Sequence, residues 1–253
     1  MRTIDDHDEM VALCGGDTLC LWAAQGPDGG SRAWVSDDGR GFAVAGAGIS
    51  LRDRLTVRGP AEAVVPLVRD VLPQAGPTFR PLGDPDVVRA LVDEVPGLVI
   101  GKPFGWMHSA GPARVTPADR HGRASGAARW LADAELDEAT VLLEKAFPDS
   151  NAMPGVPGVE RWAGIHDDTG RLAALAALAW SAPDVGLIAG VAVHPDAQGR
   201  GLGRAVCDFI LSAALARHGN AGLMVDEWNQ TAIRLYQGLG MRYRPVLAAY
   251  VSR

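Results

Sequence analysis

Lysine, basic clusters and long apolar runs are all scarce in this chain of 253 residues. Lys102 and Lys145 are the only lysines, so arginine carries nearly all of the positive charge. The formal net charge of -6 and a pI near 5.5, with no run of basic residues, argue against a nucleic-acid partner. The longest apolar runs, 172–180 and 185–193, fall well short of the roughly 20 residues that a bilayer-spanning helix needs. We therefore expect no membrane association.

Cysteine is also scarce. Cys14, Cys20 and Cys207 are odd in number and lack the paired spacing of a zinc site, which predicts buried, reduced thiols and no metal. The stretch MRTIDDHDEM at the start is acidic where a secretory signal would be positively charged and then apolar. These features predict a cytoplasmic protein.

The length and the 47% hydrophobic content suit one large domain or two ordinary ones. Residues 108–129 contain few large apolar side chains and several prolines and glycines, which is the composition of a linker. We therefore predict an N-terminal domain over 1–110, a linker over 111–127 and a C-terminal domain over 128–253.

The N-terminal part alternates short apolar runs with turn signals such as GPDGG and SDDGR, which predicts antiparallel strands. Apolar residues at helical spacing predict helices over 60–72 and 85–95, the second with Pro85 in its first turn. The expected fold of this domain is α+β.

The C-terminal part predicts a helix over 134–147 capped by Asp133, and then a hairpin of two strands over 161–167 and 171–180. Uniformly apolar residues 185–193 predict a strand that is buried on both faces. A glycine-rich loop, a helix over 202–218, a strand over 221–225 and a helix capped by Asn229 complete an α/β unit.

The loop HPDAQGRGLG, residues 194–203, connects the buried strand to a helix. Such a turn directs free backbone N–H groups and the positive end of the helix dipole at one point, which favours an anion. Gly199, Gly201 and Gly203 leave the backbone uncovered, and Arg200 and Arg204 can add charge-assisted bonds. A phosphate or pyrophosphate is the preferred ligand, although glycine also occurs at ordinary strand-to-helix turns.

Two common nucleotide motifs do not fit this loop. No Lys-Ser or Lys-Thr pair follows the glycines, as a nucleoside triphosphatase would require. Val206 stands where the third glycine of a dinucleotide fingerprint would be.

The loop resembles the acetyl-CoA loop of the GNAT superfamily of N-acetyltransferases. In that pattern Gln198, Gly201 and Gly203 follow a strand that ends in VAVHP. A second family pattern lies downstream in NQTAIRLYQGLGM, where it is filled by Asn229, Ala232, Leu235, Tyr236, Gly240 and Met241. The resemblance covers about 128–253 and implies a mixed, centrally splayed sheet flanked by helices.

The resemblance also implies roles for individual residues. Backbone groups of the last strand residues would hold the pantetheine arm and acyl carbonyl of acetyl-CoA, and amides of the loop would hold its pyrophosphate. Asn229 and Ala232 would contact the cofactor beside the splay, and Tyr236 would donate a proton to the departing CoA sulfur. The strand residues are Val191, Ala192 and Val193, and the loop residues are Gln198, Gly199, Arg200, Gly201, Leu202, Gly203 and Arg204.

Tyr236 is also compatible with a purely structural role in the core stripe of the last helix. As an acid, the phenol of Tyr236 has a pKa of about 10, and the CoA thiol has a pKa of about 8.5. Proton transfer from the phenol to the CoA thiolate is therefore uphill by only about 2 kcal/mol. No carboxylate lies in the strand before the loop, so the sequence does not identify the general base. His194, Asp226 and Glu227 at strand ends either act through water or simply form turns.

The expected function is transfer of an acetyl group from acetyl-CoA to a primary amine of a small molecule or peptide, by direct attack. A non-catalytic CoA-binding or sensor module, and a scaffold for another phosphate ligand, are the alternatives.

The loop over 147–158, with Asp149, Ser150 and Asn151, would help to form the acceptor pocket or merely shape a turn. The N-terminal domain fits three roles: a degenerate second GNAT-like copy, a wall of the acceptor site that includes Trp106 and His108, or a homodimer surface.

Overall fold

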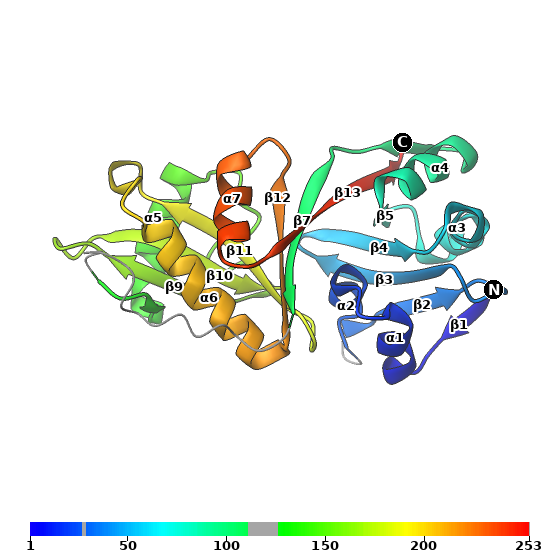
Figure 1. The fold of residues 1–253 in the computed structure, drawn as a ribbon, viewed down its shortest axis with the longest axis horizontal. Coiled ribbons are helices and arrows are strands. Elements are labelled where there is room, and N and C mark those ends of the chain that lie inside the picture. Colours follow the sequence, from blue (N-terminus) through cyan, green and yellow to red (C-terminus); the bar gives the residue numbers. More distant parts are fainter. Residues whose placement is uncertain (27–28, 111–125, 253) are drawn as a thin grey trace.

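The computed structural model describes residues 1–26, 29–110 and 126–252, so most of the expected linker lies outside the described residues. The strands form one 13-stranded sheet in the order β1-β2-β3-β4-β5-β13-β7-β12-β11-β10-β9-β8, with β6 paired to β13 outside this path. Helices flank the sheet, and its two halves meet where β7 and β13 cross the middle of the molecule (Figure 1). The predicted α/β class is confirmed.

The N-terminal half begins with an antiparallel meander and ends with a parallel pair. β4 pairs with β3 in antiparallel fashion, whereas α3 carries the chain across to β5, which is parallel to β4. The elements are β1 (Arg2–Ile4), α1 (His7–Cys14), α2 (Thr18–Ala23), β2 (Arg32–Val35), β3 (Phe42–Ile49), β4 (Arg52–Arg58), α3 (Ala61–Ala75), β5 (Arg80–Gly83), α4 (Pro85–Glu94), β6 (Leu98–Ile100) and β7 (Phe104–Ala110).

The C-terminal half repeats this order of elements. An antiparallel meander from β8 to β11 is again followed by a helix and a parallel strand, β12. The elements are β8 (Arg129–Trp130), the 3-10 turn η3 (Asp133–Glu135), α5 (Leu136–Ala146), β9 (Val159–His166), β10 (Leu172–Ala179), β11 (Gly186–Val193), the 3-10 turn η4 (Pro195–Ala197), α6 (Leu202–His218), β12 (Asn220–Asp226), α7 (Gln230–Gly238) and β13 (Arg242–Val251).

The two halves exchange their last strands. β7 leaves the N-terminal half and pairs along its whole length with β12, from Phe104 opposite Asp226 to Ala110 opposite Asn220. The end of β13 in turn pairs with β5 and β6 of the N-terminal half, while its beginning pairs with β7. Each half therefore completes its sheet with a strand from the other, and the predicted division at 110 and 128 separates segments that fold together.

Three apolar cores hold the helices on the sheet. α6 and α7 cover one face of the C-terminal half, and α3 and α4 cover one face of the N-terminal half. On the opposite face a single core joins α1 and α2 to α5, with Trp22 and Trp106 in contact at its centre. Trp106 is fully buried and donates a hydrogen bond to Thr18, so it is a packing residue.

Most of the predicted elements are confirmed, including the hairpin of β9 and β10 and the start of α4 at Pro85. The expected cap at Asp133 is wrong. Residues 133–135 form a 3-10 turn, α5 begins at Leu136, and the Glu135 carboxylate accepts a hydrogen bond from the Ala132 N–H at 2.8 Å. The carboxylate that accepts a hydrogen bond from the backbone before this helix thus belongs to Glu135, two residues after the predicted Asp133.

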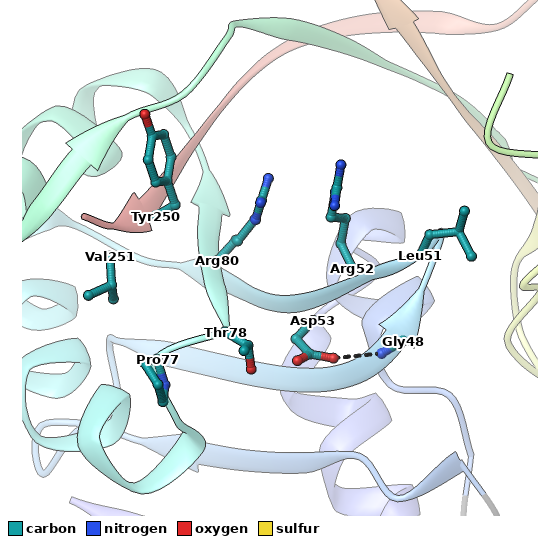
Figure 2. A pocket seen from close by; sticks show the side chains of 9 residues that line it. All are labelled: Gly48, Leu51, Arg52, Asp53, Pro77, Thr78, Arg80, Tyr250 and Val251. Carbon is teal, nitrogen blue, oxygen red and sulfur yellow. Dashed lines mark hydrogen bonds between the residues drawn. The ribbon is translucent and has the colours of Figure 1, made fainter. Parts of the chain in front are cut away.

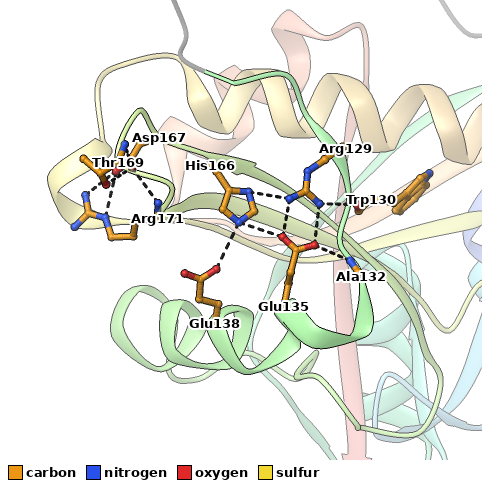
Figure 3. Close-up of polar contacts among 9 residues, drawn as sticks. All are labelled: Arg129, Trp130, Ala132, Glu135, Glu138, His166, Asp167, Thr169 and Arg171. Atoms are coloured by element: carbon orange, nitrogen blue, oxygen red, sulfur yellow. Dashed lines mark hydrogen bonds and ion pairs between the residues drawn. The ribbon is translucent and has the colours of Figure 1, made fainter.

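Glu135 also organises the polar network at this end of the C-terminal half (Figure 3). Arg129 donates two hydrogen bonds to its carboxylate, and His166 on β9 lies 3.3 Å from the same group. The Arg129 guanidinium and the Ala132 amide lower the pKa of Glu135 to about 2. This carboxylate connects β8, η3 and β9.

Within the described residues, no helix is both long and apolar enough to cross a membrane. The three cysteines are free and buried, as predicted.

Replacing Glu135 by Gln is expected to lower the melting temperature at pH 7, because the substitution removes the charge that Arg129 binds. A carboxylate whose pKa is lowered in the folded state stabilises that state above its unfolded pKa of about 4.3, and the benefit disappears as the pH falls toward 2. Melting temperatures of the two proteins should therefore converge between pH 4.5 and pH 2. Asp133→Asn, at an exposed neighbouring carboxylate, is the control; a difference that persists unchanged in acid would contradict the assignment.

Candidate functional site

β11 and β12 separate soon after they begin to pair. Their parallel ladder contains only Gly186 opposite Ala221 and Leu187 opposite Gly222, although β11 continues to Val193 and β12 to Asp226. β12 remains paired with β7 on its other side. The edge of β11 that faces β12 from residue 188 onward, the open edge, thus has no strand partner among the described residues. It includes the predicted backbone ligands Val191, Ala192 and Val193.

A bulge beside the open edge depends on a glycine. The register between β10 and β11 shifts between Leu175 and Ala177, and Gly190 opposite this region has φ +59°. A Cβ at Gly190 would lie 2.7 Å from the ring of Trp162, so the tryptophan packs directly on the glycine backbone. The indole Nε1 of Trp162 is buried without a hydrogen-bond partner among the described residues.

The glycine-rich loop provides the free N–H groups that its sequence predicts. Gly199 and Gly201 have φ +76° and +81°, and open space surrounds the place where each would carry a Cβ. The first backbone bond of α6 runs from the Ala205 N–H to the Gly201 carbonyl. In the described part of the chain the N–H groups of 199–204 have no acceptor, whereas that of Gln198 donates to the Pro195 carbonyl at 3.3 Å.

The side chain of Arg204 does not face the loop as expected. Its guanidinium donates a hydrogen bond to the Gly238 carbonyl at the end of α7, at 2.9 Å. A Cβ at Gly238 would lie 2.8 Å from the guanidinium, so the Arg204 side chain packs closely on the Gly238 backbone. Arg204 therefore holds α7 against α6, and Arg200 remains as the exposed cation of the loop.

Tyr236 lies in the core between α6 and α7. Its side chain is 7% exposed, and burial, followed by the neighbouring Cys207 thiol, raises its pKa above the usual value of about 10. Burial likewise raises the pKa of Cys207 to about 12. The phenol is thus protonated at neutral pH.

Asn229 caps α7 where the chain leaves β12. Its side-chain oxygen accepts a hydrogen bond from the Ala232 N–H at 3.1 Å, which confirms the predicted N-cap. This hydrogen bond uses the side-chain oxygen of Asn229 and the N–H of Ala232. The side-chain NH2 group of Asn229 can still donate a hydrogen bond to another partner.

Comparison with known families identifies this unit. A profile of the acetyltransferase (GNAT) family matches residues 125–241, which include the open edge, the glycine-rich loop and α7. Residues 125–241 form a GNAT family domain. No curated protein sequence matches the chain.

Solved structures resemble the whole chain and not only its GNAT domain. A GCN5-related N-acetyltransferase from Kribbella flavida is 19% identical, with 91% of this chain and 95% of that one covered and a TM-score of 0.60. A Drosophila protein is 14% identical over 99% and 98% of the two chains, with a TM-score of 0.62. A GCN5-related N-acetyltransferase-like protein from Streptococcus suis is 16% identical over 97% and 98%, with a TM-score of 0.54. At these identities the likeness concerns the fold.

The candidate bases of the GNAT domain differ in their surroundings. His194 is buried, its Nδ1 accepts a hydrogen bond from the Asp196 N–H, and its Nε2 lies 3.1 Å from Nζ of Lys145 on α5. Both ring nitrogens are therefore engaged within the protein. Asp226 and Glu227 are exposed at the end of β12, where water can reach them.

Two tryptophans at this site are not among the residues that the sequence predicts. Trp228 lies between Glu227 and Asn229 with 78% of its surface exposed, and Trp162 packs on Gly190. An exposed tryptophan is a signal only once its position is known, because the surrounding sequence DEWNQ is otherwise polar. In the loop after α5, the Ser150 hydroxyl donates to the Ala152 carbonyl, which favours the turn-forming role for Ser150.

Replacing Arg204 by Met is expected to destabilise the protein by about 0.5–1 kcal/mol, because the Gly238 carbonyl loses its charged donor. Arg200→Met is the matched control, since Arg200 belongs to the same loop and makes no hydrogen bond to described residues. Urea denaturation of both variants measures the difference. Equal stabilities would contradict the role of Arg204 at the end of α7.

Proposed function

We propose that the protein transfers an acetyl group from acetyl-CoA to a primary amine of a small molecule or peptide. The amine nitrogen attacks the thioester carbonyl carbon, a C–N bond forms, and the C–S bond then breaks. The nitrogen loses a proton and the departing sulfur gains one. The observation that carries the proposal is the set of unpaired backbone N–H groups at residues 199–204, which lie directly after the open edge of β11.

The cofactor is proposed to bind along the open edge and the loop. Backbone groups of β11 alternate between β10 and the open edge, and those of Val191, Ala192 and Val193 that face the open edge suit the amides of a pantetheine arm, which would add to β11 as a strand does. The N–H groups of residues 199–204 and the dipole of α6, a helix that spans Leu202–His218, suit a pyrophosphate. Asn229 would contact the cofactor through its free amide group, and Ala232 through its position beside that cap.

Tyr236 is proposed as the proton donor to the CoA sulfur. Its raised pKa keeps the proton on the phenol and makes it a weaker acid than a solvated tyrosine. The same low-dielectric surroundings raise the pKa of a thiol, as they do for the neighbouring Cys207. A CoA thiolate formed beside Tyr236 would therefore be a stronger base, which offsets the weaker acid.

The acceptor is proposed to be an amine that loses its proton easily. Residues 186–193 contain no carboxylate, and His194 is engaged with Asp196 and Lys145, so Asp226 and Glu227 remain for relay through water. Deprotonating an alkylamine at pH 7 costs roughly 4 to 5 kcal/mol, whereas an α-amine costs only about 1 kcal/mol. This difference favours α-amines over lysine side chains.

We infer that the N-terminal half is a second copy of the same unit that does not bind CoA. Its order of elements repeats that of the GNAT domain, and the two halves exchange equivalent strands. Its connection between β4 and α3 is only Gly59 and Pro60, where the GNAT domain has residues 194–201 between β11 and α6. Two residues, one of them without an N–H, cannot form a cradle of amides.

The second candidate function is a module that binds CoA without turnover. The absence of a carboxylate from residues 186–193 favours it, whereas the buried phenol of Tyr236, next to Cys207 of α6, favours the enzyme. An assay of thiol release with acetyl-CoA and a panel of amines separates them, because a sensor binds acetyl-CoA but releases no thiol with any amine.

Gly201→Ala is expected to weaken acetyl-CoA binding, because φ +81° strains an alanine and shifts the N–H groups that follow. Gly170→Ala is the matched control: Gly170 has φ +82°, is also surrounded by open space, and lies in the remote turn between β9 and β10. Both variants should lose about 1 kcal/mol of stability. Calorimetric titration with acetyl-CoA should distinguish them, and equal affinities would argue against the loop as the cofactor site.

Tyr236→Phe is expected to lower kcat by about 100-fold, with little change in KM for acetyl-CoA, because the ring remains and only the proton donor is lost. Unchanged thermal unfolding would verify that the core is intact. If the enzyme turns over and the variant matches it, Tyr236 is only a packing residue.

A further inference from the structure

Four cationic side chains in the N-terminal half gather without an acidic partner. Arg52 and Arg54 belong to β4, Arg80 to β5, and Lys102 to the connection between β6 and β7. Within the described ranges, their side chains make no hydrogen bond or ion pair. Seven other arginines pair with carboxylates, at positions 2, 40, 69, 89, 129, 171 and 244, whereas arginines such as Arg200 that lack such a partner among the described residues do not gather in this way.

The arrangement of these arginines is unfavourable for the protein alone. Arg54 and Arg80 are direct partners in the parallel ladder of β4 and β5, and like charges in this position repel. Arg52 is two residues from Arg54 and thus lies on the same face of β4. Arg80 lies over the ring of Tyr250, 5.8 Å from its centroid, but the repulsion among the three guanidinium groups is relieved only if an anion is present.

Of the three arginines, Arg54 is in the least favourable surroundings for a charge. Its side chain is only 8% exposed, and its Nε is buried with no hydrogen-bond partner in the described part of the chain. Burial, and then the charges of Arg80 and Arg52, lower its pKa to about 10. An unpaired buried charge is costly, and an anion bound beside this guanidinium would supply the missing opposite charge.

The basic groups line two adjoining hollows of about 540 and 590 Å³, which share Arg52, Arg80 and Tyr250. Such volumes suit a small molecule. In Figure 2, Arg52 and Arg80 lie side by side and point in the same direction, with Tyr250 next to Arg80. The one carboxylate in the first hollow, Asp53, accepts a hydrogen bond from the Gly48 N–H instead of binding an arginine.

The second hollow extends to the seam between the halves. Arg54 and Lys102 line it together with Phe104, the first residue of β7. Phe104 pairs with Asp226 at the end of β12, where β11 and β12 have separated. The hollow therefore reaches the strand that borders the GNAT domain, although its cationic side chains come from the N-terminal half alone.

We propose that these two hollows form a binding site for a small, multiply charged oxyanion, either a phosphate compound or a polycarboxylate. Planar guanidinium groups donate paired hydrogen bonds to both kinds of anion, and three of them with a lysine match more than one negative charge. The residues of this site are separate from the glycine-rich loop. The proposal therefore stands independently of acetyl transfer.

The test is calorimetric titration with inorganic phosphate, pyrophosphate and citrate at low salt. Each titration is performed with and without saturating CoA, which on the proposed function occupies the glycine-rich loop of the GNAT domain. At least one anion should bind in the presence of CoA, and Arg80→Gln and Arg52→Gln should each weaken it by about tenfold. Arg89→Gln, at an exposed arginine of α4 that pairs with Asp86, should leave the affinity unchanged. The relative affinities of phosphate and citrate identify the preferred class.

Arg54→Met provides a second, opposite signature. Without an anion this variant should melt at a higher temperature than the parent protein, because it removes a buried charge that has no partner. It should also lose the stabilisation that the bound anion gives to the parent. If no anion binds at millimolar concentration, if Arg80→Gln binds as well as the parent, or if Arg54→Met lowers the melting temperature without an anion, the proposal is wrong.

Discussion

The exchange of β7 and β13 is the constraint on which the rest of this structure depends. Each strand fills a place in the sheet of the other half, so the backbone hydrogen bonds of either half are complete only when both have folded. Buried backbone groups without partners are costly, which makes the two halves one cooperative unit. Arg244 on β13 reinforces the exchange, because its guanidinium lies 2.7 Å from Asp17 and 2.9 Å from Asp84, at the starts of α2 and α4.

The open edge of the GNAT domain lies beside the exchanged strand β7. β12 is held by β7 along its full length, yet it keeps only two pairs with β11. The open edge of β11 ends at Val193, and the chain continues from there into the glycine-rich loop with its free N–H groups. Trp162 on Gly190 and Arg204 on Gly238 fix the neighbouring strand and helix, so the site is formed by packing and not by mobile side chains.

The two halves share an order of elements and differ at the connection that we propose to hold the cofactor. The GNAT domain has a long glycine-rich connection, whereas the N-terminal half has a tight turn that closes off the same position. The N-terminal half instead concentrates unpaired arginines on β4 and β5, at the seam that the exchange creates. The proposed anion site there would give the N-terminal half a binding role of its own.

The sequence by itself determined the local elements and the family. Apolar spacing, Pro85 and the Asn229 cap specify helices through contacts within a few residues, and the glycine-rich loop and NQTAIRLYQGLGM identify the GNAT domain. Only the tertiary structure decided the partners of β7 and β13, the engagement of Arg204 with Gly238, and the meeting of Arg52, Arg54 and Arg80. These features join residues that are distant in sequence, and neither hydrophobic periodicity nor a short motif records which distant segment will complete a strand or neutralise a charge. The displaced helix start after Asp133 has the same origin, because Arg129 and His166 decide which carboxylate faces the backbone.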